Sequence, residues 1–400
     1  MNTPRRSGRF YLNRRQTAVY CALDLGTNNC RLLIAEPDAG GFTVIDAFSR
    51  IVRLGEGVSQ TRRISDSAME RTLEALAVCR GKIRSRKVTR MRLVATEACR
   101  MAENGPGFVT RIRHELGLNL EIISHKTEVR LATAGCASLV DPTARSVIIF
   151  DIGGGSTEIA WLRGKIGSVE QDPCRLIRAW DSLPAGVVPL AERYAGRMLE
   201  PTVFEEMVAD VIQMLETFAH RARPAMSGRD VHLLGASGTV TTIGGIFLDL
   251  PRYNRTRVDG MWMSNDEVEK VIGEVAMMSF AERLAHRCIG PERAELVLAG
   301  CAILEAIRRT FPCERLRIAD RGLREGILMS MMRKDNVWNA FRNNGQKNAP
   351  RSGAMKQKGR PAGSGRKRKT GNGRPRSETN RRNGAQPQPV LPDVAPAAAQ

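Results

Sequence analysis

An apolar run that is interrupted by a single aspartate occurs twice in this chain. Residues 18–25 are apolar except for Asp24, a turn of glycine, threonine and asparagine follows, and the apolar pattern resumes at residue 30. Residues 146–163 repeat this order with Asp151 at an offset of 127 residues. Each copy is typical of two buried strands joined by a tight turn. A single repetition predicts an internal duplication into two related α/β lobes rather than a solenoid.

Segments with helical spacing follow these strands in both halves of the chain. Residues 65–86 begin with capping residues and place apolar side chains at Met69, Leu73 and Leu76, which predicts a helix. A strand followed by the start of a helix is predicted in three further segments, residues 88–100, 119–139 and 231–246. The alternation of strands and helices predicts the α/β fold class.

The two ends of the chain differ from its body in charge and composition. The formal net charge is +20, but residues 1–19 hold five arginines and no acid, and residues 334–400 hold fifteen Lys and Arg against three acids. The tail has almost no large apolar residue, so it cannot bury enough surface to offset chain entropy. We expect disorder at residues 1–17 and 334–400, lobe I at residues 18–140 and lobe II at residues 141–333.

The nine cysteines are scattered singly, and no CxxC pair offers metal-ligand spacing. This odd number of separated cysteines predicts buried, reduced thiols in a cytoplasmic protein. The arginine-rich N-terminus has no apolar core segment, so it is not a secretory signal. No segment approaches the ~20 apolar residues of a membrane span. We therefore expect a cytoplasmic protein without a membrane partner.

Both turns combine a carboxylate with hydrogen-bond donors. Glycine and asparagine adopt positive φ, so that consecutive N–H groups can point into one concavity, and Thr27, Asn28, Ser156 and Thr157 add side-chain donors. Such a site fits phosphate oxygens, and a carboxylate at its mouth favours a phosphate that carries Mg²⁺. The alternative is two structural turns that aspartate merely initiates. The matching second copy favours phosphate binding, although no P-loop motif is present.

Further polar residues follow the predicted strands. Arg100, one helical turn after Thr96, could grip phosphate oxygens, and Glu128, at a predicted helix start, could orient an attacking water. From the residues alone, the favoured interpretation is instead that Arg100 lies on the surface and that Glu128 interacts with the helix dipole. Glu158 is either a second acid near a metal or an exposed strand residue. Residues 235–245 either contact a ligand at a helix N-terminus or form a simple turn.

Together these segments resemble the exopolyphosphatase / guanosine pentaphosphate phosphohydrolase (Ppx/GppA) family of the actin–sugar kinase–Hsp70 superfamily. The resemblance spans roughly residues 18–333 and is carried by "DLGTNNCRLLI" at 24–34, "VATEACR" at 94–100, "EVRL" at 128–131, "DIGGGSTE" at 151–158, "GASGT" at 235–239, "ERAELVLAGCAIL" at 292–304 and "ADRGLREG" at 319–326. It implies two ribonuclease-H-like (actin-like ATPase) lobes with a cleft between them. It also implies Mg²⁺-dependent hydrolysis of terminal phosphoanhydrides.

The resemblance further implies roles for individual residues of this chain. Glu128 corresponds to the catalytic base. The acids associated with Mg²⁺, or with another hard divalent cation, correspond to Asp24, Asp151 and Glu158. The residues that bind substrate phosphate correspond to Thr27, Asn28, Asn29, Arg31, Arg100, Gly153, Gly154, Gly155, Ser156 and Thr157.

The chain departs from the family pattern in three places. The first turn has Thr27 and Asn29 where serine is usual, which preserves the donors. Where the family usually has Gly-x-Glu-Glu-Ala-Arg, residues 125–130 keep the second glutamate, replace the first by Thr127, and add His125 and Lys126. This change bears on substrate preference and pH optimum. Longer family members continue into a C-terminal helical domain related to metal-dependent HD phosphohydrolases, and here we expect the basic tail in its place.

We therefore expect hydrolysis of inorganic polyphosphate with release of orthophosphate. The alternative within the class is conversion of guanosine pentaphosphate to tetraphosphate. The alternative from another class is a non-enzymatic nucleotide- or RNA-binding sensor whose tail contacts nucleic-acid phosphates, although the tail lacks interleaved aromatic residues. The tail favours a long polyanion, which it would bind weakly and in a salt-dependent manner, unless it is only a solvated extension. A homodimer is left open.

Overall fold

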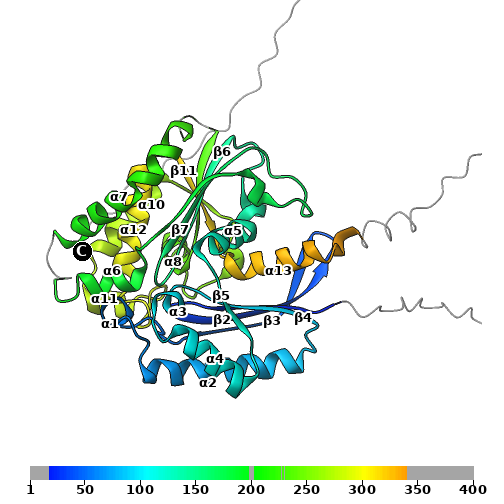
Figure 1. Ribbon diagram of the computed structural model, residues 1–400. Coiled ribbons are helices and arrows are strands. Elements are labelled where there is room, and N and C mark those ends of the chain that lie inside the picture. Colours follow the sequence, from blue (N-terminus) through cyan, green and yellow to red (C-terminus); the bar gives the residue numbers. More distant parts are fainter. Residues whose placement is uncertain (1–17, 198–201, 227, 229, 340–400) are drawn as a thin grey trace, which may run out of the picture. The chain divides into compact units, whose positions relative to one another are not determined.

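Two β-sheets organise the part of the chain that the computed structural model describes, namely residues 18–197, 202–226, 228 and 230–339 (Figure 1). The strands of the first sheet are β1 (Tyr20–Leu25), β2 (Asn29–Asp38), β3 (Gly41–Ile51), β4 (Arg90–Ala95) and β5 (Leu120–Ile122). The strands of the second sheet are β6 (Ser146–Ile152), β7 (Thr157–Arg163), β8 (Ile177–Leu183), β9 (Val231–Ala236), β10 (Trp262–Ser264) and β11 (Arg315–Ala319).

The two sheets share one topology. The first runs β3-β2-β1-β4-β5, with an antiparallel meander β1-β2-β3 and with β4 and β5 parallel to β1. The second runs β10-β11-β9-β6-β7-β8, where β6-β7-β8 form the meander and β9 and β11 continue in parallel. Only the edge strand β10 has no counterpart among the described strands. The predicted α/β class and the duplicated ribonuclease-H-like lobes are therefore confirmed.

Helices cover the faces of both sheets. The longer helices are α2 (Asp66–Ser85), α4 (Gly105–Leu116), α5 (His125–Cys136), α7 (Val203–Ala222), α8 (Gly238–Phe247), α10 (Asn265–Met277), α12 (Val297–Thr310) and α13 (Leu323–Lys334). The shorter helices are α1 (Val58–Thr61), α3 (Glu97–Met101), α6 (Val187–Arg193), α9 (Arg255–Val258) and α11 (Phe280–Ala285), with 3₁₀ turns η1 (Ala137–Leu139), η2 (Pro173–Leu176) and η3 (Arg223–Ala225). The predicted helix at residues 65–86 is α2, capped by Ser65.

The central strand β1 is apolar on both faces because both faces are covered. Cys21, Leu23 and Leu25 pack toward α2 and α4, whereas Tyr20 and Ala22 pack toward α13. The side chains of β6 alternate in the same way: Ile148, Phe150 and Ile152 pack toward α7, α8 and α12, whereas Val147 and Ile149 pack toward α5. A strand buried on both faces reads as a continuous apolar run. This is why Asp24 and Asp151, which end these runs, stand out in the sequence.

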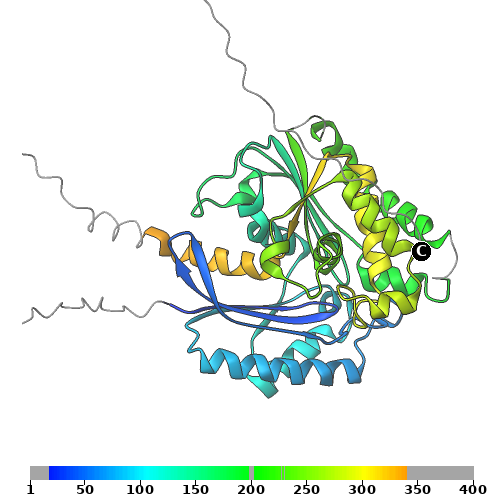
Figure 2. The same ribbon diagram turned by 180° about the vertical axis from the view of Figure 1, so that it is seen from behind.

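Helices α5 and α13 lie between the two sheets, as the opposite views in Figures 1 and 2 show. They cross at glycines: a Cβ on Gly135 would lie 1.9 Å from the Gly322 carbonyl oxygen, and a Cβ on Gly326 would lie 1.8 Å from that of Leu131. Neither position accepts a side chain. The close crossing joins the first residues of α13 to the helix that carries Glu128.

The described chain continues past the predicted start of the tail. The Trp338 side chain is 2 % exposed, and its Nε1 donates hydrogen bonds to the carbonyl oxygens of Asp38 (3.0 Å) and Gly41 (3.2 Å). The predicted disorder at residues 1–17 and beyond residue 339 lies outside the described residues. All nine cysteines are buried and unpaired, as predicted. In the described ranges, no helix is long and apolar enough to cross a membrane.

Candidate active site

A cavity of about 380 Å³ opens where the two hairpin turns meet the first residues of α5 and α8. Twelve of the fourteen predicted site residues line it, namely Asp24, Thr27, Asn28, Asn29, Arg31, Glu128, Asp151, Gly153, Gly154, Gly155, Ser156 and Glu158. Segments that are far apart in the sequence therefore meet in one place. This convergence favours a ligand site over two unrelated structural turns.

The two turns have the same backbone geometry. The Gly26 N–H donates to the Asn29 carbonyl oxygen at 2.9 Å, and the Gly153 N–H donates to the Ser156 carbonyl oxygen at 2.9 Å. Each turn follows a strand that ends next to an aspartate, so the backbone of the duplication is preserved at the site.

The turns pack directly against each other. A Cβ on Gly154 would lie 3.0 Å from the backbone nitrogen of Asn28, and a Cβ on Gly155 would lie 2.4 Å from Oγ1 of Thr27. The second turn therefore needs its glycines. Within the described chain, Oγ1 of Thr27 is buried without a hydrogen-bond partner. An unsatisfied buried hydroxyl is unfavourable, so this atom points to a polar ligand in the cavity.

Six acidic residues of the described chain line this cavity, and in four of them burial is the main cause that raises the pKa. Burial raises the pKa of Asp151 to about 6, with repulsion from Asp24 adding to it. Burial raises the pKa of Glu158 to about 7, and Asp151 adds to it. The pKa values of Asp24 and Glu128 are raised in the same direction. Crowded acids of this kind favour a bound cation, which would relieve their repulsion.

Glu128 lies in the first turn of α5, whose N-terminus is capped by the Ser124 hydroxyl. Its side chain is 7 % exposed. Nη1 and Nη2 of Arg100 both donate to Oε2 of Glu128 at 3.0 Å, while Nε of Arg100 donates to Glu97 at 2.9 Å. Nη1 also donates to the Ile123 carbonyl oxygen at 2.7 Å. Arg100 thus fixes the orientation of Glu128 and leaves Oε1 out of this pairing.

Arg100 and Thr157 are the two predicted phosphate-binding residues that do not line the cavity. The guanidinium of Arg100 forms ion pairs with Glu97 and Glu128. The Thr157 hydroxyl is fully buried and donates to the Ala185 carbonyl oxygen at 2.5 Å. Their phosphate-binding roles stay predictions, and the contacts indicate that both residues support the groups that line the cavity.

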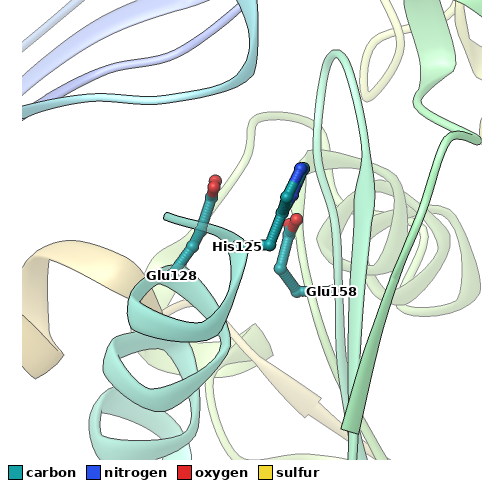
Figure 3. Close-up of side chains that lie close together, drawn as sticks. All are labelled: His125, Glu128 and Glu158. Carbon is teal, nitrogen blue, oxygen red and sulfur yellow. The ribbon is translucent and has the colours of Figure 1, made fainter. Parts of the chain in front are cut away.

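His125, Glu128 and Glu158 lie close together (Figure 3), and the two glutamates line the cavity. Each offers one ligand atom, and these atoms lie within 4.8 Å of one another. The Ser182 hydroxyl lies 2.8 Å from Nδ1 of His125 and donates to Oε1 of Glu158 at 2.9 Å. Imidazole and carboxylate groups both bind divalent metals.

Two overlapping sets of residues are therefore candidates for a divalent cation. The predicted set, Asp24, Asp151 and Glu158, offers only oxygen atoms, which Mg²⁺ prefers. The set seen in Figure 3 shares Glu158 and adds the nitrogen of His125. Both candidate sets include Glu158 on the second hairpin.

Two arginines of the cavity wall were not predicted as site residues. Arg50 on β3 and Arg293 before α12 line the cavity together with Arg31. Nη1 of Arg293 donates to Oγ1 of Thr242 at 2.9 Å. Arg293 belongs to a segment that carried the family resemblance, whereas nothing near Arg50 in the sequence marks it. These guanidinium groups can neutralise phosphate oxygens.

The segment at residues 235–245 contacts the cavity, which decides between its two interpretations. Ser237, Gly238 and Thr239 line the cavity at the N-terminus of α8. The Ser237 hydroxyl accepts a hydrogen bond from the Val240 N–H at 3.0 Å. Its φ of 152° is rare for a residue other than glycine, and such strain is common where a loop is held for binding.

Comparison with known proteins now identifies the family. Residues 33–335 match the model of the Ppx/GppA phosphatase family. The chain belongs to the Ppx/GppA phosphatase family. The resemblance drawn from the sequence is thereby confirmed, because the matched segment contains most of the residues of the cavity.

Three proteins with similar sequences or structures support the family assignment and the fold. The guanosine-5′-triphosphate,3′-diphosphate pyrophosphatase of Aeromonas hydrophila is 28 % identical over 315 residues, covering 78 % of this chain and 59 % of its own length. The chain thus spans only 59 % of this curated relative. The Aquifex aeolicus Ppx/GppA family member is 30 % identical with a TM-score of 0.65, covering 80 % of this chain and 99 % of its own. An exopolyphosphatase-like protein is 29 % identical with a TM-score of 0.71, covering 80 % of this chain and 100 % of its own.

Proposed function

We propose that this Ppx/GppA family member hydrolyses the terminal phosphoanhydride bond of inorganic polyphosphate and releases orthophosphate. The observation that carries the proposal is the buried carboxylate of Glu128, which faces a cavity walled by two turns rich in donors. Phosphoanhydride hydrolysis requires a positioned water, donors to the phosphate oxygens and compensation of their charge. The cavity offers groups of all three kinds.

In the proposed reaction, Glu128 orients the attacking water and accepts its proton. Arg100 holds Oε2 of Glu128 and leaves Oε1 for that water. The raised pKa of Glu128, caused mainly by burial, strengthens it as a base once it is ionised. The Thr27 hydroxyl and the N–H groups of the turns receive the terminal phosphate. Arg31 neutralises its charge.

The acids of the cavity fit Mg²⁺ or another hard divalent cation. Asp24, Asp151 and Glu158 would hold it, because burial raises the pKa of each carboxyl group and a bound cation would offset the cost of burying their charges. When bound, the cation supplies the positive charge that stabilises the oxygens of the reacting phosphates. His125 offers a further ligand next to Glu158.

Guanosine pentaphosphate is the second candidate substrate, and the name of the Aeromonas relative favours it. Both candidates present a terminal phosphoanhydride to the same residues. A non-enzymatic nucleotide or RNA sensor would use the cavity for binding but would not need the Glu128 carboxylate. Glu128 therefore separates the enzyme from the sensor.

The test is phosphate release by the purified protein with Mg²⁺, comparing polyphosphate and guanosine pentaphosphate at several salt concentrations. Glu128→Gln keeps the size of the side chain but removes the base, and should slow release by ~10²–10⁴-fold. Glu121→Gln is the matched control, because Glu121 is exposed and only pairs with Arg92. Wild-type release by Glu128→Gln would reject the mechanism.

We propose that the basic tail raises the affinity for polyphosphate at low salt. Deletion of residues 340–400 should therefore weaken polyphosphate binding at low salt and leave the turnover rate intact. This deletion spares Trp338, whose side chain is buried.

Nine buried, unpaired thiols support a cytoplasmic location. The lobe boundary at residue 140 and the homodimer stay predictions.

A further inference from the structure

Another cavity, of about 950 Å³, shares no lining residue with the catalytic cavity. Its walls come from the turn between β2 and β3, the segment between β7 and β8, α9 and α13. Gly135, at the crossing of α5 and α13, also lines it. We call it the Arg333 pocket, after a cation in its wall. Its volume is typical of ligand sites, and the proposed reaction uses none of its residues.

Three acidic residues line the Arg333 pocket, and each is paired with an arginine. The ion pairs are Asp172–Arg130, Asp259–Arg321 and Glu325–Arg255. The other carboxylate oxygen of Glu325 accepts a hydrogen bond from the Gly322 N–H at 2.9 Å. The acids of the pocket therefore have partners already, and they leave its remaining cations without an ion pair.

Three cations of the Arg333 pocket form no ion pair in the part of the chain that the structure describes, namely Lys165, Arg175 and Arg333. Arg333 is half-buried, and its Nε donates to the Val169 carbonyl oxygen at 2.9 Å. Its Nη1 and Nη2 have no hydrogen-bond partner among the described residues. Burial lowers the pKa of Arg333, and the charge of Asp172 opposes this effect only in part. Cations held in this way favour a bound anion, which would compensate their charge.

Much of the remaining lining is apolar and partly open to solvent. Val44 is 42 % exposed, and Phe42 on the same strand is half-buried. Ile166 and Leu176, between β7 and β8, and Met329 on α13 add further apolar side chains. A bare inorganic anion would leave this surface in contact with water, whereas an apolar group attached to the anion would cover it.

We propose that the Arg333 pocket binds an anionic amphiphile, that is, a single alkyl chain that ends in a carboxylate or a phosphate. The guanidinium of Arg333 binds either head group, and Lys165 and Arg175 add positive charge. The alkyl chain lies against Phe42 and Val44. Neither a bare phosphate nor an uncharged lipid matches both parts of the lining. The inference does not depend on the proposed reaction, because the pocket and the catalytic cavity have separate walls.

The test is isothermal titration calorimetry of the full chain with octyl phosphate, octanoate and 1-octanol, each below the concentration at which it aggregates. We expect the two octyl anions to bind at a single site per chain and at least ~10-fold more tightly than 1-octanol, because charge-assisted hydrogen bonds discriminate by that order. Orthophosphate, which lacks the alkyl chain, should not displace them. The ratio of the affinities for octyl phosphate and octanoate identifies the preferred head group.

Two variants test whether the octyl anions bind in this pocket. Arg333→Met removes a cation of the wall and should weaken both anions ~10-fold or more. Its matched control is Arg178→Met, since Arg178 is exposed and does not line the pocket. Val44→Asp places a like charge beside the alkyl chain and should weaken both anions to a similar degree. Its matched control is Val78→Asp on α2, where the side chain is 38 % exposed and lies outside the pocket.

Folding does not obscure this test. Because Val44 is exposed, Val44→Asp should melt near the wild-type temperature, even if Arg333→Met is destabilised by the loss of its bond to Val169. Equal affinity of the wild-type chain for the octyl anions and for 1-octanol would overturn the inference. Octyl anion affinities that neither Arg333→Met nor Val44→Asp changes would also overturn it, because the ligand would then bind elsewhere.

Discussion

The two hairpins of the cavity share one backbone but carry opposite charges at equivalent positions. In the first, Asp24 pairs in register with Arg31, and in the second, Asp151 pairs in register with Glu158. The same offset of 127 residues that relates the aspartates also relates Arg31 to Glu158. After the duplication, one hairpin thus presents a cation beside its aspartate and the other presents a second anion.

Because their charges differ, we expect the two hairpins to have different roles in binding phosphate and the cation. The charge of Arg31 lowers the pKa of both Asp24 and Asp151 against the larger effect of burial. Glu158 has no such partner on its own hairpin, and its pKa is raised to about 7. We expect Arg31 to make the first hairpin the stronger phosphate-binding side, and Asp151 and Glu158 to make the second hairpin the source of two of the three proposed cation ligands.

Glu158→Arg gives the second hairpin the charge of the first and should have the largest effect. It removes a cation ligand and adds a positive charge, so kcat should fall by ~10³-fold or more. Calorimetry should detect no Mg²⁺ binding. Arg163→Glu, an exposed charge change on the same strand, is the control. Since Glu158→Arg also buries a new charge, Glu158→Gln serves as a milder variant; undiminished Mg²⁺ affinity in that variant would contradict the assignment.

Arg31→Met removes the cation from the first hairpin. A charge-assisted hydrogen bond to a phosphate contributes ~1.5–3 kcal/mol, so KM for polyphosphate should rise by roughly 10–100-fold. Because Arg31 is not one of the proposed cation ligands, and two of these, Asp151 and Glu158, lie on the other hairpin, Mg²⁺ affinity should stay near wild type. Arg31→Lys should recover part of the loss. If Arg31→Met abolished Mg²⁺ binding and left KM unchanged, the division between the hairpins would be wrong.

The second hairpin should also give the cation site its pH dependence. Asp151 and Glu158, with pKa values of about 6 and 7, hold protons that a cation must displace. Below these values, Mg²⁺ affinity should fall about tenfold per pH unit for each displaced proton. The folded state also binds these protons more tightly than the unfolded state, so without Mg²⁺ stability falls as pH rises from about 4 through 7. Melting with and without Mg²⁺ should show a larger stabilisation at pH 8 than at pH 6. Equal stabilisation would contradict this.

The local pattern of the sequence was enough to predict the hairpins and the helix that carries Glu128. A buried strand, its terminal aspartate and a turn rich in glycine are encoded within ten or so residues, so they can be read without a structure. The capping serine before Glu128 is equally local. The equivalence of Asp24 and Asp151 followed from repetition alone.

Contacts between distant segments could not be read in the same way. Arg321 pairs with Asp259 on the loop after α9, a partner that lies 62 residues away in the sequence. Arg50 reaches the cavity from an edge strand with no local signal. The orientation of such side chains depends on how α5, α13 and the two sheets pack, which no short motif specifies.

The smallest expected effect comes from the turns themselves, at the equivalent positions Asn28 and Gly155. Gly155→Ala would place a Cβ 2.4 Å from Oγ1 of Thr27, so overpacking should destabilise the fold by ~1–3 kcal/mol. Asn28→Ala shortens a half-buried side chain that lies next to Gly154 and should change stability by ~0.5 kcal/mol or less. Urea unfolding of both variants measures the difference. Thr27→Ala should relieve part of the Gly155→Ala penalty in the double variant, because the two residues are in contact. If the two changes in the free energy of unfolding were strictly additive, steric contact between the turns would not be the cause of the Gly155→Ala penalty.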